Sequence, residues 1–222
     1  MNALTLPSFV GYFLTNTLSL LGTWVQKVGL GWLAWQITES TFWTSVVSLL
    51  LMAPVGLLGP FIAVFAERWN SRYAMLATKI MMLGISGVIF VIQLLGLHNL
   101  FTLVACSTAL GLLSAFHHPI RLVFISLVVP KPYLASAVGL NSVSWNLSRI
   151  IGPGLAGLTI HLMGLSETFF IAILLYAPLI VSLYFLVLQP RTGNTAEPTS
   201  FLKRMIDGGA VALRTPIIFS TL

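Results

Sequence analysis

The chain has 222 residues, of which 57% are apolar and only 7% are charged, and its formal net charge is +6. A soluble domain carries about 25% charged residues, so this composition excludes a soluble globular protein and indicates an integral membrane protein. It also excludes an intrinsically disordered chain and a nucleic-acid-binding module. The single cysteine, Cys106, excludes a disulfide framework and any cysteine-based zinc or redox motif.

Six apolar segments, taken in chain order, are long enough to cross a bilayer as helices. A hydrocarbon core of about 30 Å takes about 20 residues of helix. The segments are 8–36, 42–65, 73–96, 100–127, 136–163 and 168–189. Runs such as 80–97 lack the alternation of barrel strands. The sequence therefore predicts an all-α, polytopic membrane protein in which residues 1–189 form a bundle of six transmembrane helices.

The basic residues between segments predict the orientation of the chain. Arg68 and Arg72 follow the second segment and Lys131 follows the fourth, whereas the breaks after the first, third and fifth segments contain no Lys or Arg. Short basic loops stay in the cytoplasm, so we expect the N-terminus and the C-terminal tail to be cytoplasmic.

The tail after residue 189 divides into two predicted parts. The first part, residues 190–214, comprises a linker over 190–200 that is rich in Pro, Gly and Thr and a helix over 201–213 with apolar and charged residues on opposite faces. Such a helix is expected to lie on the cytoplasmic surface of the membrane. Residues 215–222 are apolar again and predict the start of a seventh helix, cut short.

Polar residues recur at helical spacing on the first, fourth and fifth segments, whereas the third and sixth are apolar almost all round and are expected to face lipid. Three polar faces in one bundle predict a shared, solvated cavity. The candidate lining residues are Asn16, Thr23, Gln26, His117, His118, Arg121, Asn141 and Arg149.

The ionisable residues within these segments allow more than one interpretation. Arg149 faces water, a partner or substrate, or else an internal ion pair or a backbone carbonyl. We expect Lys27 to extend toward the outer interface, and Arg121 either does the same or lines the cavity. His117 and His118 are adjacent and cannot chelate one metal together, so they either titrate in the cavity or form hydrogen bonds in the core. We expect no metal and no cofactor.

An internal repeat relates the two halves of the six-segment region. Gly59-Pro60 in the second segment and Gly152-Pro153 in the fifth are offset by 93 residues, and three helices separate one copy from the next. Copies three helices apart run in opposite directions across the membrane. The sequence therefore predicts a 3+3 inverted repeat, which is common in secondary transporters.

Two stretches carry a family resemblance. The loop over 63–72 contains Glu67, Arg68 and Arg72, and the fifth segment contains Ser148, Gly152, Pro153, Ala156 and Gly157. They resemble the cytoplasmic loop motif and the exporter-associated motif of the major facilitator superfamily, within its bacterial branch of macrolide-efflux and siderophore-exporter proteins. The loop departs from its motif at Ala63, Glu67, Asn70 and Ser71.

The resemblance implies the N-terminal half of a twelve-helix fold, completed by a second six-helix bundle. It also implies a secondary transporter of the bacterial inner membrane, an exporter or antiporter of drug-like or siderophore-like small molecules rather than an enzyme. Glu67, Arg68 and Arg72 would then form a cytoplasmic gate, although both arginines also fit a role in topology alone. The fifth-segment motif either bears on transport direction or only packs helices closely.

Two other interpretations of the sequence stay open. The chain is a truncated or non-transporting membrane scaffold that needs a second bundle to function, or it is an intramembrane enzyme that uses His117 and His118 with a bound metal. The expected partners are the lipid bilayer, a small molecule and a second bundle, but not nucleic acid.

Overall fold

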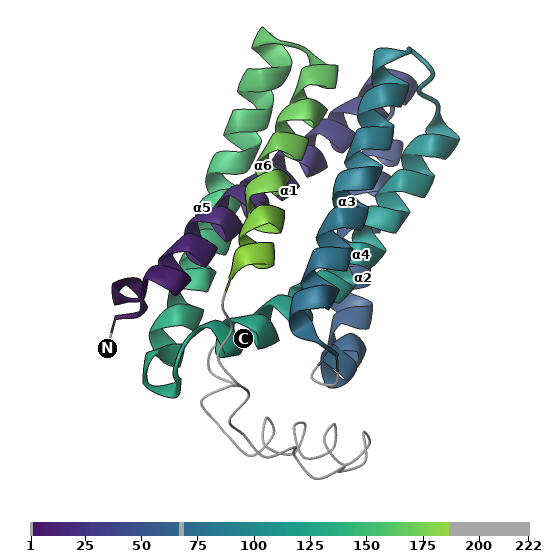
Figure 1. The fold of residues 1–222 in the computed structure, drawn as a ribbon. Helices are drawn as coiled ribbons and strands as arrows, with labels where there is room; N and C mark the ends of the chain where they lie inside the picture. The colour runs from purple at the N-terminus through teal and green to yellow at the C-terminus, as the bar shows by residue number, and fades with distance from the viewer. Residues whose placement is uncertain (1, 67–68, 187–222) are drawn as a thin grey trace, which may run out of the picture. The chain divides into compact units, whose positions relative to one another are not determined.

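A computed structural model describes residues 2–66 and 69–186, and within these ranges all regular structure is helical (Figure 1). The helices are α1 (Pro7–Thr38), α2 (Thr41–Ala66), α3 (Ser71–Leu94), α4 (Leu100–Val128), α5 (Leu134–Leu162) and α6 (Leu165–Phe185), with 3₁₀ turns η1 (Ala3–Thr5) and η2 (Lys131–Tyr133). The all-α prediction is confirmed. The largest difference from an expected boundary is at the end of α6, which is Phe185 rather than 189.

The chain separates into two compact units, Met1–Gln189 and Pro190–Leu222. The predicted linker and amphipathic helix of 190–214, and the predicted seventh helix of 215–222, lie outside the described residues. The described helices therefore all belong to the first unit.

Local sequence signals explain where the helices begin and end. Asn70 and Asn99 accept hydrogen bonds from the first-turn N–H groups of Tyr73 and Thr102, and Asn99 forms a full capping box with Thr102. Glu39, at the end of α1, has a positive φ of 49° and lets the chain turn into α2. The connections are therefore short, and consecutive helices run antiparallel.

Four of the six helices, α2, α3, α4 and α6, are long and apolar enough to cross a membrane. The helices α1 and α5 are also long, at 32 and 29 residues, but polar side chains lower their mean hydropathy. The structure thus supports a membrane protein with four candidate spans among its described residues.

The helices pack as two groups, α1 with α5 and α6, and α4 with α2 and α3, and the groups meet where α3 packs on α6 and α1 packs on α2. α1 contacts α5 and α6 along much of its length and also packs on α2, while α4 packs between α2 and α3. Figure 1 shows α1 running obliquely past α6, with α2, α3 and α4 gathered beside it. The junctions α1–α2, α3–α4 and α5–α6 lie at one end of the bundle, and the start of α1 lies at the other (Figure 1).

Two glycines allow the closest helix contacts. A Cβ atom at Gly152 on α5 would overlap Trp24 on α1, and one at Gly111 on α4 would overlap the carbonyl of Leu50 on α2. Small residues at such positions let helix backbones approach in membranes, where packing rather than the hydrophobic effect drives association. These contacts hold α1 against α5 and α2 against α4.

The expectation that the third and sixth helices are apolar almost all round is wrong for α3. Lys79 and Ser86 lie on its buried face, with exposed fractions of 1% and 0%. α6 contacts both α1 and α3 and buries a face that includes Phe169 and Tyr176. Hydropathy does not distinguish lipid-facing from buried apolar surface, because both favour the same side chains.

Candidate functional site

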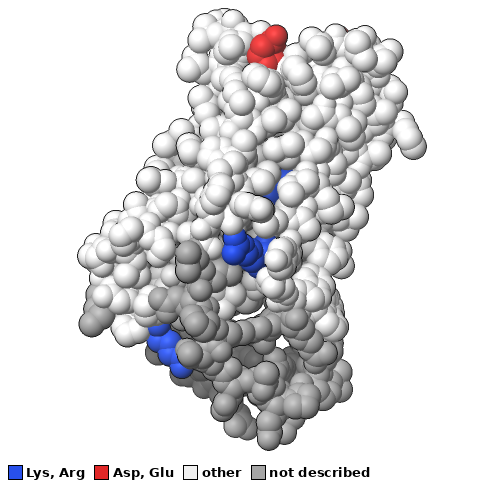
Figure 2. Space-filling view, viewed as in Figure 1, with Lys and Arg blue, Asp and Glu red and all other residues white. Residues whose placement is uncertain are grey.

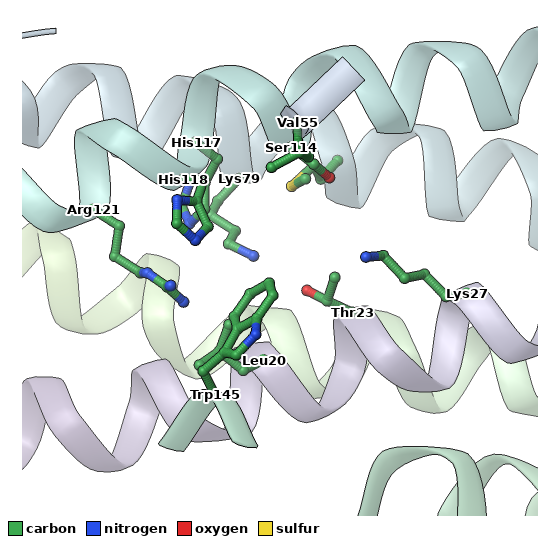
Figure 3. Close-up of a pocket in the computed structure, with 11 residues that line it drawn as sticks. Leu20, Thr23, Lys27, Val55, Lys79, Ser114, His117, His118, Arg121 and Trp145 are labelled. Atoms are coloured by element: carbon green, nitrogen blue, oxygen red, sulfur yellow. The ribbon is translucent and has the colours of Figure 1, made fainter. Parts of the chain in front are cut away.

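A small cavity lies within the bundle, lined by side chains from α1 to α5 (Figure 3). It encloses about 30 Å³, whereas pockets that take a whole drug-sized ligand hold roughly 300–1,000 Å³. Its polar and aromatic lining comprises Thr23, Lys27, Lys79, Ser114, His117, His118, Arg121 and Trp145. In this state the space admits a single polar group rather than a complete small molecule.

Three cations from three helices line this cavity, and each lies on an aromatic ring. The Lys27 Nζ is 4.7 Å from the centre of the Trp24 ring, and the Lys79 Nζ is 4.7 Å from that of Tyr176. The Arg121 guanidinium carbon lies 5.0 Å from the Trp145 ring centre. Figure 3 shows the Lys27 and Lys79 ammonium groups pointing into the same open space from opposite sides.

No carboxylate neutralises these charges within 2–66 and 69–186. The two acidic residues there, Glu39 and Glu167, lie at helix ends, and the lining of the cavity contains neither. Figure 2 likewise shows basic atoms at mid-height of the visible face and acidic atoms only near one end. A cation–π contact contributes about 0.5–2 kcal/mol, less than the roughly 2.5–3.5 kcal/mol that a charge at the bilayer centre costs. The aromatic rings alone therefore do not compensate the charge.

Arg121 is almost completely buried and keeps hydrogen-bond donors without a partner among the described residues. It is 2% exposed, and its Nε and Nη1 atoms have no hydrogen-bond partner among the described residues. Buried guanidinium N–H groups normally donate to carboxylates, phosphates or carbonyl groups. Of the two expected positions for Arg121, at the membrane interface or in the cavity lining, the structure has it in the cavity lining.

The two histidines differ in their surroundings. The His117 Nδ1 lies 2.9 Å from the Thr78 Oγ1, while its Nε2 has no partner among the described residues. The His118 ring meets Trp145 edge-on, with ring centres 5.4 Å apart. No group of three or more potential metal-ligating residues occurs in the described part of the chain.

Gln26 serves packing rather than an open cavity wall. Its Nε2 donates to Ser86 Oγ on α3 at 2.7 Å, and its Oε1 accepts from the Tyr176 hydroxyl on α6 at 2.7 Å. Both ends of the amide are therefore occupied, and three helices meet at this one side chain. Gln26 also borders a smaller pocket together with Thr23 and Lys27.

The remaining cavity candidates fall into two places. Asn16 and Asn141 are buried, at 2% and 6% exposure, but are not among the lining residues of the main cavity. Arg149 is exposed on the outer side of α5, away from the cavity.

Lys27 points into the cavity instead of toward the outer interface, so that expectation is wrong (Figure 3). In this inward orientation the ammonium group of Lys27 contacts the ring of Trp24.

Comparison with known proteins decides the family. Residues 2–209 match the family model described as transmembrane secretion effector, a division of the major facilitator superfamily. The chain belongs to this family. The expected resemblance is thereby confirmed, and the chain is related to transporters of the superfamily.

Several relatives from bacteria are similar to this chain over most of its length. An uncharacterised MFS-type transporter, YfiS, of Bacillus subtilis is 25% identical over 94% of this chain and 50% of the relative. The staphyloferrin A transporter of Staphylococcus aureus is 26% identical over 76% and 44%, and macrolide efflux protein A of Streptococcus pyogenes is 22% identical over 93% and 51%. The chain spans about half the length of these superfamily members.

The cytoplasmic loop motif of the superfamily is only partly described here. Glu67 and Arg68 lie outside the described residues. The Arg72 guanidinium donates to the backbone carbonyl of Tyr184 near the end of α6. Arg72 therefore connects the start of α3 to the end of α6.

The exporter-associated motif on α5 divides between two faces. Ser148, Gly152 and Ala156 are buried and follow one another at four-residue spacing on the side toward α1. Pro153 is partly exposed and Gly157 is exposed. Three of the five residues thus pack α5 against other helices, and the other two lie toward the outer surface.

Lys79, Ser114 and Trp145 are polar or aromatic lining residues that are absent from the predicted set. Lys79 lies in the first half of a largely apolar segment, and a lone cation within such a segment is itself a signal of a polar site. Trp145 lies four residues after Asn141 on a polar face, where an aromatic residue carries no distinctive signal.

Proposed function

We propose that this chain forms the first six-helix bundle of a secondary transporter, which exports a small molecule by alternating access together with a second bundle. The observation that carries the proposal is the cavity at the centre of the bundle, into which three membrane helices direct cations. The relatives include a macrolide efflux protein and a staphyloferrin A transporter. Both of these relatives are named for transport, which favours a binding site for cargo in this chain.

Six spans are the arrangement that the helix packing favours. Some of the polar side chains that lower the hydropathy of α1 and α5 bond across the contact between the two helices, for example Thr17 and Ser144, whose hydroxyl oxygens lie 2.8 Å apart. Buried polar groups that bond one another are compatible with a membrane interior. We therefore infer that α1 and α5 cross the bilayer as well.

A 3+3 inverted repeat is also consistent with the close contacts. In such a repeat α1 corresponds to α4 and α2 corresponds to α5. The α1–α5 contact at Gly152 then corresponds to the α4–α2 contact at Gly111. Both glycines belong to the second half of the repeat, on α4 and α5, so the two contacts correspond as pairs of helices but not residue by residue. Inverted repeats of this kind place a binding site near the middle of the membrane.

The exposed polar face of α5 supports a second bundle as partner. Ser142, Asn146 and Arg149 are exposed and recur at helical spacing on that face. Lipid is an unfavourable surrounding for an arginine at this depth. We propose that this face meets the second bundle, and that the loop of Glu67, Arg68 and Arg72 contacts the same bundle as a cytoplasmic gate in the bacterial inner membrane.

Export assays on the full-length protein encoded by the gene test this proposal. Cells that express it should retain less of some members of a panel of macrolides, dyes and carboxylate siderophores than cells with an empty vector. Collapse of the proton-motive force should abolish the difference, since secondary transport draws on an ion gradient. If expressing and empty cells retain every compound equally, the non-transporting scaffold is the better description.

A further inference from the structure

The cavity concentrates positive charge that nothing in the described chain balances. Lys27 from α1, Lys79 from α3 and Arg121 from α4 all line it, and the described residues contain no ion pair to any of them. Lys79 and Arg121 are also almost completely buried, at 1% and 2% exposure. Like charges so placed repel one another, and the low-dielectric surroundings strengthen that repulsion.

The hydrogen-bond donors of Arg121 that lack a partner in the described part of the chain also favour an anionic ligand. Two nitrogen atoms of Arg121, Nε and Nη1, have no acceptor among the described residues, and the guanidinium has no lone pair of its own to offer a cationic ligand. A cationic or purely apolar ligand would leave these donors unsatisfied. An oxyanion would satisfy them and reduce the repulsion between the lysines.

We propose that this cavity binds an oxyanion, a carboxylate or phosphate group of the transported molecule, with Lys79 and Arg121 as its direct partners and Lys27 opposite them. The inference rests on the proposed function, because it names the class of cargo for the same site. The volume of about 30 Å³ suits one such group, so the rest of the molecule lies outside this cavity, toward the second bundle.

Anion binding can be measured on the purified full-length protein without transport. Trp24 and Trp145 contact the cations directly, so their fluorescence reports on the cavity. Citrate and inorganic phosphate serve as the two probes, and trimethyl citrate serves as the uncharged analogue. We expect a saturable fluorescence change with citrate, with phosphate or with both, and none with the ester. Citrate alone indicates a carboxylate cargo, and phosphate alone indicates a phosphorylated one.

Charge substitutions make the assignment specific. Lys79→Met keeps the length of the side chain but removes its charge, and it should weaken anion binding by about tenfold or more. Lys79→Arg should retain binding within a few-fold, and Lys131→Met, which removes an exposed charge outside the cavity, should leave it unchanged. Should Lys79→Met not fold, Lys27→Met provides the same comparison at a half-buried position.

The outcomes separate this inference from the proposed function. Export without saturable binding of either anion, or equal binding by Lys79→Met and the unaltered protein, would overturn the anion site while leaving a transporter. The first result is expected if carboxylates of a second bundle neutralise the three cations. Saturable, Lys79-dependent anion binding without any export would keep the site and reject the transport function.

Discussion

Buried polar side chains in this bundle are of two kinds. Those of the first kind form hydrogen bonds between helices, as Gln26 does with Ser86 and Tyr176. Those of the second kind, such as Arg121, keep donors without a partner among the described residues. Groups of the first kind stabilise the fold, whereas groups of the second kind are available to a ligand.

The Gln26–Tyr176 bond provides a test of the first kind. Gln26→Leu should lower the free energy of unfolding by about 1–2 kcal/mol, because it leaves the buried Tyr176 hydroxyl without its acceptor. Tyr176→Phe removes the other partner, so the double variant should lose less than the sum of the two single losses. Thermal unfolding of the purified full-length protein measures all three. Strictly additive losses would show that the bond contributes nothing.

At the scale of helices, close contact between α1 and α5 depends on one small residue. Trp24 on α1 leaves no room for a Cβ atom at Gly152, whereas nothing lies within 4 Å of a Cβ atom at Gly154, two residues further along α5. The two glycines therefore form a matched pair within one helix. Replacing each glycine by alanine therefore distinguishes the effect of helix packing on stability from the effect of helix propensity.

Gly152→Ala should destabilise the protein by about 1–3 kcal/mol, since the helices must move apart to fit the methyl group. Gly154→Ala should be neutral or stabilise it by up to about 1 kcal/mol, because alanine favours helix more than glycine does. Unfolding temperatures of the two variants give the comparison directly. An equal response of both positions would contradict the close contact seen at Trp24.

At the scale of the whole molecule, the proposed six spans predict which ends of the helices share a compartment. Leu4 and Lys131 precede α1 and α5, and Ser40 and Met163 follow them. In a Cys106→Ser background, single cysteines at Ser40 and Met163 should react with an impermeant maleimide added outside intact cells. Cysteines at Leu4 and Lys131 should react only after the membrane is opened. Labelling of Leu4 and Ser40 from the same side would mean that α1 does not cross.

The sequence was sufficient to predict the helices and the polar character of the interior, because length and hydropathy depend on local composition. It could not predict which face of α5 points inward, so Arg149 was assigned to the cavity although it is exposed outside it. Nor did it predict the role of Lys79, because the contact with Tyr176 depends on how α3 meets α6. Such pairings arise from tertiary packing between segments distant in the chain.

The glycine contacts at Gly152 and Gly111 constrain how the bundle changes shape. Sliding α1 along α5, or α2 along α4, would drive Trp24 or the Leu50 carbonyl against the adjacent turn of the partner helix. Each pair is therefore expected to move as a rigid body. A transport cycle built on this bundle would accordingly tilt it as one unit, with the conformational change concentrated at its outer faces.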